Sequence, residues 1–265
     1  PLSGASGMYL ALTGHGKTAS QFFVIEVASK SIVHVEEIST EFTHAGGPAG
    51  LGDVLIVPLE MPCDPFKSFF SPCVQHSKIM FYDVSTPTSP KFLYSIDRPN
   101  VPAGAVGILK QQNGKFLLIV GRADSAIIDF YVSGSADGNL KSDPAFKQIA
   151  QWQKSELLAN PGLSANFESY QNLNLVLQKD GQIFMVGSVR TPLLVGRDYY
   201  DLFKLQPSGG GRVSITKVAS RAMTSKKCDF YAGASIYVDS ATKMNGYCVG
   251  WNPDMFSGLI TINQF

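Results

Sequence analysis

The sequence predicts an all-β domain built from a repeated antiparallel unit, and three observations support this fold class. Aromatic residues make up 11% of the 265 residues and Val and Ile are frequent, a composition that is typical of strands. Tight-turn signals recur between apolar runs at similar intervals along the chain. Helical periodicity is nearly absent, and we interpret its best candidate, residues 152–158, as a connection between units. We therefore expect a single domain over residues 1–265.

Asn-Gly and Asp-Gly pairs between two apolar runs are the strongest turn signals in the chain. They end on Gly114, Gly181 and Gly246, and Gly52 occupies the same place in a weaker Gly-Asp form. The four glycines lie 62, 67 and 65 residues apart. The sequence therefore predicts a structural repeat of about this length, with a hairpin turn at each glycine.

Each repeat reads as four consecutive strands, the first of which precedes the turn. The second strand reads VLIVPLE, FLLIVGR, IFMVGSV and YCVGWNP, with MYLALTGH as a fifth copy. The third carries aromatics and an acid near its middle, as in QFFVIEVAS, KIMFYDVST and AIIDFYVSG. The fourth follows in SIVHVEEI, KFLYSI and VSITKVA, and AFKQIAQW is a weaker copy. Such meanders bury both faces only when they pack around an axis, which predicts a β-propeller of about five four-stranded blades, with four or six as alternatives.

The two ends of the chain leave the closure of the ring open. The N-terminal unit needs an innermost strand, which residues 1–7 could supply although they are rich in Gly and Ser. The C-terminal unit lacks an outermost strand. We expect that the two ends share one blade, that the ring closes imperfectly, or that residues precede Pro1 in the whole protein.

Residues 77–96 contain an apolar I-x-x-Y-D-V-S strand that is followed by a proline-rich turn and a second strand. The motif consists of Ile79, Tyr82, Asp83, Val84, Ser85, Pro87 and Pro90. This segment resembles the LVIVD repeat of β-propeller proteins. The resemblance is specific over this one segment, and the other copies lack the Pro-x-x-Pro turn. It implies a propeller and no particular activity.

Charge and hydropathy narrow the classes of partner. The chain has 22 basic and 21 acidic residues, a net charge of +1, which argues against binding of nucleic acid through bulk charge. No apolar run approaches the roughly 18 residues that a membrane-spanning helix needs. We therefore expect no nucleic-acid partner and no membrane span, and a small molecule, a glycan or a protein as the partner.

The four cysteines fall into two plausible pairs. Cys63 and Cys73 bracket a loop rich in turn formers, and Cys228 and Cys248 flank a strand-like segment. Their spacings match no zinc-site pattern. One or two disulfides in an exported protein and free thiols in a reducing compartment are both open interpretations. A disulfide between Cys63 and Cys73 would favour a secreted or periplasmic location.

The starts of the inner strands predict a ring of residues at one mouth of the central channel. They are residues 42–47, 100–105, 167–172 and 229–234, and three of them contain an Ala-Gly step, whose small side chains fit a crowded axis. The polar members of the ring are His44, Gln171, Asn172 and Asn174. They form either a ligand site or a ring of water-bonded groups, which any propeller channel has.

The loops between the second and third strands should lie on the same face as that ring. Their polar and charged residues are His15 and Lys17; Glu60; Arg122 and Asp124; Arg190, Arg197 and Asp198; and Trp251, Asn252 and Asp254. A desolvated Arg recognises carboxylates or sugar hydroxyls, whereas an exposed Arg–Asp pair is only structural. Glu60 follows an apolar strand, so we expect it to be partly buried, in a salt bridge or as a catalytic or metal-binding group. The loop of residues 60–77 carries Phe66, Phe69 and Phe70, as a lid or packed on a neighbouring blade.

Two classes of function are consistent with these features. The sequence has no G-x-S-x-G elbow, P-loop, G-x-G-x-x-G or H-E-x-x-H motif, which favours a binding protein without turnover. The candidate ligand-binding residues are His15, His44, Glu60, Arg122, Asp124, Asn172, Arg190 and Trp251. The alternative is a hydrolase or lyase at the central channel, with Glu60 or His44 as general base. It would use carboxylates or a divalent cation held by Glu60, Asp124 and Asn172.

Overall fold

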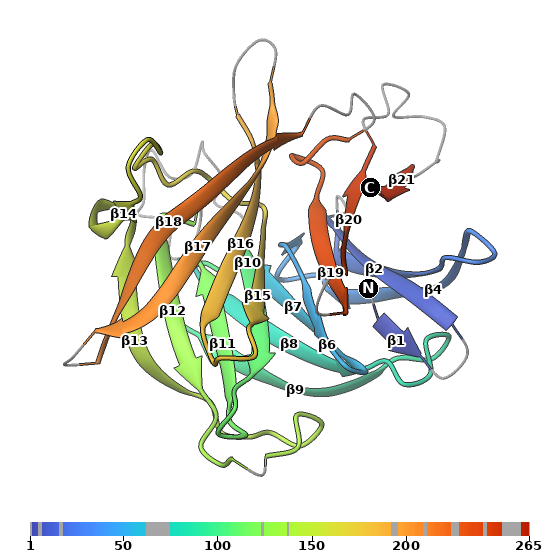
Figure 1. Cartoon of the computed structure of the whole chain (residues 1–265). Coiled ribbons are helices and arrows are strands. Elements are labelled where there is room, and N and C mark those ends of the chain that lie inside the picture. Colours follow the sequence, from blue (N-terminus) through green and yellow to red (C-terminus); the bar gives the residue numbers. More distant parts are fainter. Residues whose placement is uncertain are drawn as a thin grey trace, which may run out of the picture.

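The strands form five antiparallel sheets, arranged around an axis as the blades of a β-propeller (Figure 1). The computed structural model describes residues 2–4, 7–15, 18–61, 75–122, 125–136, 138–191, 196–208, 211–223, 228–240, 243–250 and 261–264, with the backbone alone for residues 2–4 and His15. These residues contain a short 3-10 helix and no α-helix. No helix among them is long and apolar enough to cross a membrane. The predicted all-β propeller with five blades is confirmed.

In each blade the chain runs from the innermost strand outward. Blade 1 consists of β1 (Leu2–Gly4), β2 (Gly7–His15), β3 (Ser20–Glu26) and β4 (Ser31–Ser39). Blade 2 consists of β5 (His44–Ala45), β6 (Ala49–Leu51), β7 (Val54–Glu60), β8 (Ser77–Asp83) and β9 (Lys91–Arg98). Blade 3 consists of β10 (Ala105–Lys110), β11 (Phe116–Gly121), β12 (Ile127–Val132) and β13 (Lys147–Gln153).

The last two blades differ from this pattern at their outer edges. Blade 4 consists of β15 (Asn172–Leu177), β16 (Ile183–Arg190), β17 (Asp198–Ser208) and β18 (Arg212–Met223), and β14 (Leu158–Ala159) pairs in parallel with the outer side of β18. Blade 5 consists of β19 (Ala234–Ser240), β20 (Lys243–Val249) and β21 (Ile262–Gln264). A 3-10 turn at Lys154–Glu156 and β14 form the link between blades 3 and 4, which agrees with the predicted connection at residues 152–158.

Three of the four predicted glycine turns are confirmed. Gly52, Gly114 and Gly181 have φ angles of 60°, 82° and 86°, in the left-handed region where glycine carries no steric penalty. The prediction for Asn245-Gly246 is wrong, because both residues lie inside β20, which pairs with β19 up to Ser240 and Lys243. This register buries Tyr247 and Cys248, and that burial prevails over the local turn preference.

The core lies between the blades, and its largest part joins blades 3 and 4. Trp152 from β13 packs edge to face on Phe167 at 4.8 Å between ring centroids, and Phe167 lies 5.1 Å from Phe203 of β17. Burial of each such ring contributes about 1.5–3 kcal/mol. Other apolar clusters join blades 1 and 2 and blades 2 and 3. Each blade therefore buries its second face against a neighbour, as the repeat predicts.

The inner strands of blades 2, 3 and 4 meet at the axis through backbone contacts. Gly47 donates its N–H to Gly104 O at 2.8 Å and accepts from Val106 N at 3.0 Å. A Cβ atom on Gly46 would lie 2.0 Å from Gly104 O, and one on Gly47 would lie 2.0 Å from Gln171 O. These two positions therefore require glycine, which confirms the expected crowding at the axis.

Blades 1 and 5 close the ring through side chains in the described part of the chain, and the predicted sharing of one blade is not observed there. The short β1 supplies the innermost strand of blade 1, and β21 pairs with β20. The two blades meet through Leu10, Ile25 and Tyr247, and the Tyr247 hydroxyl donates to Met8 Sδ at 3.1 Å. Among the described residues, this junction contains the fewest fully buried apolar side chains of the clusters between blades.

Candidate functional site

A cavity of about 800 Å³ lies on the axis and is lined by residues from all five blades. His44 is the first residue of β5, Asn172 is the first of β15, Glu60 is the last of β7, and Arg122 directly follows β11. First strands start and second strands end at the same face of an antiparallel meander. The repeat therefore brings these four side chains to one mouth of the cavity, although they are far apart in the sequence.

His44 and Glu60 form a direct pair at this mouth. His44 Nδ1 lies 2.8 Å from Glu60 Oε1, and the side chains are 41% and 15% exposed. The second oxygen, Glu60 Oε2, accepts the backbone N–H of Ala103 at 3.0 Å. The expectation that Glu60 is partly buried is therefore met, and its side-chain partner is His44. The carboxylate is fixed from two sides, and it lines the cavity together with the His44 ring.

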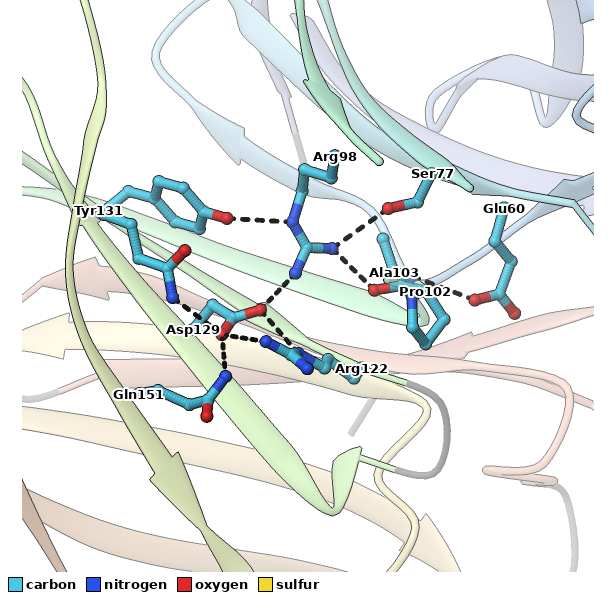
Figure 2. A network of polar contacts seen from close by, with 10 residues as sticks. Glu60, Ser77, Arg98, Pro102, Ala103, Arg122, Asp129, Tyr131 and Gln151 are labelled. Atoms are coloured by element: carbon cyan, nitrogen blue, oxygen red, sulfur yellow. Dashed lines mark hydrogen bonds and ion pairs between the residues drawn. The ribbon is translucent and has the colours of Figure 1, made fainter. Parts of the chain in front are cut away.

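A buried ion network lies behind Glu60, between blades 2 and 3 (Figure 2). Arg98, the last residue of β9, donates to Pro102 O at 2.6 Å, to Ser77 Oγ at 3.2 Å, to Tyr131 Oη at 3.0 Å and to Asp129. The carbonyl of Pro102 and the N–H of Ala103 belong to one peptide group. Arg98 therefore holds the oxygen of this peptide while Glu60 holds its nitrogen, which couples the buried cation to the carboxylate at the mouth.

Asp129 holds Arg122 in one orientation through two hydrogen bonds. Arg122 donates Nε and Nη2 to the two oxygens of Asp129 at 2.9 and 3.0 Å, and Gln148 and Gln151 each add an amide hydrogen bond at 3.1 Å. Burial alone would raise the pKa of Asp129. Hydrogen bonds from Arg122 and Gln151 and the charges of Arg98 and Arg122 together hold the pKa below its ordinary value. Asp129 is therefore a charged support that fixes the Arg122 guanidinium at the cavity wall.

Blade 4 carries a second charged group toward blade 5. Arg190 Nη1 lies 3.3 Å from Asp229 Oδ1 and 3.5 Å from Asp198 Oδ1. Burial raises the pKa of Asp198 and the charge of Asp229 adds to this, while Arg190 and the N–H of Phe230 act in the opposite direction. Arg190 therefore stabilises the start of blade 5, and it does not belong to the described lining of the cavity.

Two asparagines on β15 join blade 4 to blade 5. Asn172 Oδ1 accepts the N–H of Ala234 at 3.2 Å, and Asn174 Oδ1 accepts the N–H of Ile236 at 3.4 Å. Both the donors and the acceptors are two residues apart, so the side chains imitate a strand ladder between two inner strands. The side-chain oxygen of Asn172 therefore already accepts a hydrogen bond from the backbone of blade 5.

An exposed aromatic ring stands at the start of blade 5. Tyr231 is 74% exposed and lines the cavity, and the residues beside it are held in place by a disulfide. Cys228 and Cys248 are bonded, which settles one of the two predicted pairs. Asp229 accepts the N–H of Tyr231 at 3.0 Å. The loop that presents this ring is thus tied to β20 and to Arg190.

The structure brings together part of the predicted site. His44, Glu60, Arg122 and Asn172 line the cavity, whereas Arg190 binds the aspartates of the junction between blades 4 and 5. His15 ends β2 near this face, and only its backbone is described. The residues Asp124, Trp251, Lys17, Asn252, Asp254, Cys63, Cys73, Phe66, Phe69 and Phe70 lie outside the described residues.

Sequence reasoning missed Arg98, Asp129 and Tyr231. An acid in the middle of the apolar run IIDFYV was a visible signal for Asp129, because a buried acid requires a partner. No local signal identifies Arg98 as that partner, since it comes from the outer strand of the preceding blade. In the described part of the chain, no group of three or more His, Cys, Asp or Glu side chains could hold a metal ion.

Comparisons with known proteins support the fold alone. No family model and no curated protein matches the chain, so the LVIVD resemblance stays a prediction. Among solved structures, a protein of unknown function from Dyadobacter fermentans is similar, with 12% identity and a TM-score of 0.53 over 94% of this chain and 73% of that one. An exo-β-1,3-galactanase from Phanerochaete chrysosporium, solved with β-1,3-galactotriose, is similar with 11% identity and a TM-score of 0.50. That match covers 98% of this chain and 58% of the galactanase, so the chain spans less than two thirds of that enzyme.

Proposed function

We propose that the protein binds a glycan at the polar mouth of the central cavity, without turnover. The observation that carries this proposal is the convergence of a fixed carboxylate, a fixed guanidinium and an exposed aromatic ring on one cavity. These groups are Glu60, Arg122 and Tyr231, and they come from three different blades. A site of this kind suits a ligand that is rich in hydroxyl groups and has apolar ring faces.

Each of these groups has a defined role in the proposed site. Glu60 accepts hydrogen bonds from sugar hydroxyls, and its pairing with His44 and Ala103 holds it in one orientation. Arg122 donates to hydroxyl oxygens, and its two hydrogen bonds with Asp129 keep the guanidinium from turning away. Tyr231 offers an exposed ring face for the apolar side of a pyranose. Preorganised polar groups lose little entropy on binding, which favours affinity.

The similarity to a galactanase that was solved with β-1,3-galactotriose selects this trisaccharide as the first probe. At 11% identity it supports the fold, and the glycan proposal depends on the cavity itself.

A hydrolase is the second candidate function, because His44 paired with Glu60 has the arrangement of an oriented general base. Glycoside hydrolysis commonly uses two carboxylates, and Glu60 is the carboxylate in the described lining of the cavity. The cation set Glu60, Asp124 and Asn172 fits poorly in its described part. Glu60 is engaged by His44 and Ala103, and Asn172 by Ala234.

Isothermal titration with β-1,3-galactotriose and a glycan array test the proposal. We expect saturable binding, and a loss of affinity of about 10-fold to 100-fold in Glu60→Gln and in Arg122→Met, because each removes charged hydrogen bonds. Glu36→Gln is the matched control, since His34 and Glu36 form the same type of pair at 2.9 Å on the outer strand β4. Arg212→Met at the exposed start of β18 is the control for Arg122.

Three results would contradict the proposal. The first is the absence of binding across the array, and the second is equal losses in the control variants. The third is release of smaller sugars from the trisaccharide by the wild-type protein but not by Glu60→Gln, which would favour the hydrolase. A chelator-sensitive affinity would favour a bound cation.

A further inference from the structure

The hydrogen-bonding groups that line the central cavity are not balanced between acceptors and donors. Both oxygens of Glu60 already face a donor, and the carbonyl of Gly46 accepts the hydroxyl of Thr13 at 2.7 Å. Arg122 and Asn172, by contrast, each keep an N–H donor from which no described group accepts. This imbalance favours a ligand group that accepts hydrogen bonds over one that donates them.

The amide of Asn172 is buried, and its orientation is fixed. Asn172 is 6% exposed, and its Oδ1 accepts the N–H of Ala234 at 3.2 Å. Because a backbone N–H can only donate, the amide oxygen must face Ala234, and Nδ2 lies on the other side of the amide group. Nδ2 lies near the axis, since a Cβ atom on Gly47 would come within 2.8 Å of it. A buried N–H without an acceptor is unfavourable, so a ligand that supplies an acceptor gains affinity at this point.

Arg122 belongs to a network with an excess of positive charge. It donates Nε and Nη2 to Asp129, and no described group accepts from Nη1. Asp129 also contacts Arg98, so two guanidinium groups share one carboxylate (Figure 2). Among the described ion pairs, Glu60 pairs with His44 and with neither arginine. One positive charge of the network therefore lacks a direct counter-charge, and an anionic ligand group would supply it.

The two donors lie on segments that contact each other. Ser125, three residues after Arg122, donates its hydroxyl to the carbonyl of Tyr170 at 3.0 Å, and Tyr170 comes two residues before Asn172. The chain after β11 and the start of β15 therefore meet at the cavity wall, and both Ser125 and Tyr170 line the cavity. A small anionic group at this wall can reach both segments.

We propose that the glycan is acidic, and that the carboxylate of a uronic acid residue binds to Arg122 and Asn172. This inference rests on the proposed function, because it takes the sugar at the mouth from it. A carboxylate has two oxygens and no N–H or O–H donor, so it can accept from the guanidinium and from the amide at the same time. A neutral sugar would leave the positive charge of the network without a counter-charge.

Titration with methyl β-galactoside and methyl β-galacturonide tests this inference. The two compounds differ only at C6, which is a hydroxymethyl group in the first and a carboxylate in the second. At low salt we expect the galacturonide to bind about 10-fold to 100-fold more tightly, because its hydrogen bonds are charged. A higher salt concentration should weaken binding of the galacturonide severalfold and leave binding of the galactoside unchanged.

Asn172→Asp is the variant that tests the position of the carboxylate. The new side chain can still accept the N–H of Ala234, and it replaces the free donor by a negative charge. We expect it to abolish the preference for the galacturonide. Asn113→Asp is the matched control, since the Asn113 oxygen also accepts a backbone N–H, that of Lys115 at 3.0 Å, in the exposed turn between β10 and β11. The control should keep the preference of the wild-type protein.

The outcomes separate the two proposals. Equal affinities of the wild-type protein for the two compounds would overturn the acidic glycan and leave sugar binding intact, and this comparison needs no variant to fold. A preference that survives in a folded Asn172→Asp variant would also overturn the inference, because the carboxylate would then bind elsewhere. If neither compound binds, and no neutral or acidic glycan on the array does, the proposed function itself fails.

Discussion

The two sides of the ring are built differently. Between blades 2, 3 and 4 the inner strands touch through glycine backbones, and a buried arginine joins two blades. Between blades 5 and 1, the described residues place three buried apolar side chains at the junction, Leu10, Ile25 and Tyr247. Figure 1 shows both chain ends near blade 5. One side of the molecule is therefore locked by backbone contact and buried charge, and the other by a few side chains.

Both sides of the ring line the cavity. Gly46, Gly47 and Gly104 line it from the closely packed inner strands of blades 2 and 3, and residues of β2 and β19 line it from blades 1 and 5. The locked side also supplies Glu60 and Arg122, the two fixed charged groups of the mouth. The candidate site thus combines fixed charged groups from one side with the exposed ring of Tyr231 from the other, and its affinity should depend on both.

Substitution of Gly47 should have the largest effect on this comparison. We expect Gly47→Ala to unfold the protein or to cost about 4 kcal/mol or more, because its Cβ would overlap Gln171 O at 2.0 Å and backbone must shift. Gly104→Ala is the control in the same ring, since its Cβ would have its nearest contact at 3.6 Å. Urea unfolding monitored by circular dichroism measures both. Equal stability of the two variants would show that the axis is not crowded.

Removal of Arg98 should cost nearly as much. Its side chain is 2% exposed, and Arg98→Met would leave Asp129 buried with one cation fewer, so we expect a loss of about 3–5 kcal/mol. Arg190→Met at the junction of blades 4 and 5 should cost less, about 1.5–3 kcal/mol, because Arg190 itself is 32% exposed although its partners Asp198 and Asp229 are largely buried. Denaturant unfolding of both variants provides the comparison. A larger loss of unfolding free energy for Arg190→Met than for Arg98→Met would show that the buried arginine between blades 2 and 3 is not the stronger link.

Removal of the disulfide in blade 5 should lower the free energy of unfolding by an intermediate amount. The bond between Cys228 and Cys248 closes a loop over a separation of 20 residues, which corresponds to about 3 kcal/mol. The double variant Cys228→Ser and Cys248→Ser should therefore melt at a lower temperature and bind the glycan more weakly, because the loop that carries Tyr231 is released. Calorimetry and titration measure the two effects. Unchanged binding would exclude this loop from the site.

The pH dependence of stability should give the smallest effects, with opposite sign at two carboxylates. The lowered pKa of Asp129 means that its contribution to stability is complete above its unfolded value of about 3.9 and is lost as pH falls through the folded pKa. The raised pKa of Asp198 means that stability falls as pH rises from about 3.9 through the folded pKa. Asp129→Asn should therefore lack the fall in unfolding free energy that wild type shows at low pH, so that the two curves converge there. Asp198→Asn should lack the fall that wild type shows as pH rises above about 3.9. Curves parallel to wild type would contradict both assignments.

The fold was largely predictable because its signals are local and repeated. Gly52, Gly114 and Gly181 adopt the positive φ that their turns require. Asn245-Gly246 gave the same local signal and lies in a strand, because the register that buries Tyr247 and Cys248 prevails. Turn chemistry thus predicts a hairpin only where the burial pattern of the flanking strands agrees with it.

The candidate site was predictable in its placement and less so in its partners. His44, Glu60, Arg122 and Asn172 were assigned to one face because the repeat fixes where strands begin and end. The partner of Arg122 was expected nearby in the sequence at Asp124, and the structure shows Asp129 in that role. Contacts between blades, such as Arg98 with Asp129, depend on how neighbouring sheets pack, and the sequence of a single repeat does not contain that information.

Hydrogen–deuterium exchange with and without the glycan tests the central claim most directly, since it reports on both sides of the ring at once. In the free protein we expect slow exchange in β10, β11 and β15 and fast exchange in β19 and β20. The glycan should slow exchange at residues 229–238 and around His44 and Glu60. Uniform exchange in the free protein, or protection by the glycan only on the outer strands β4, β9 and β13, would contradict the account.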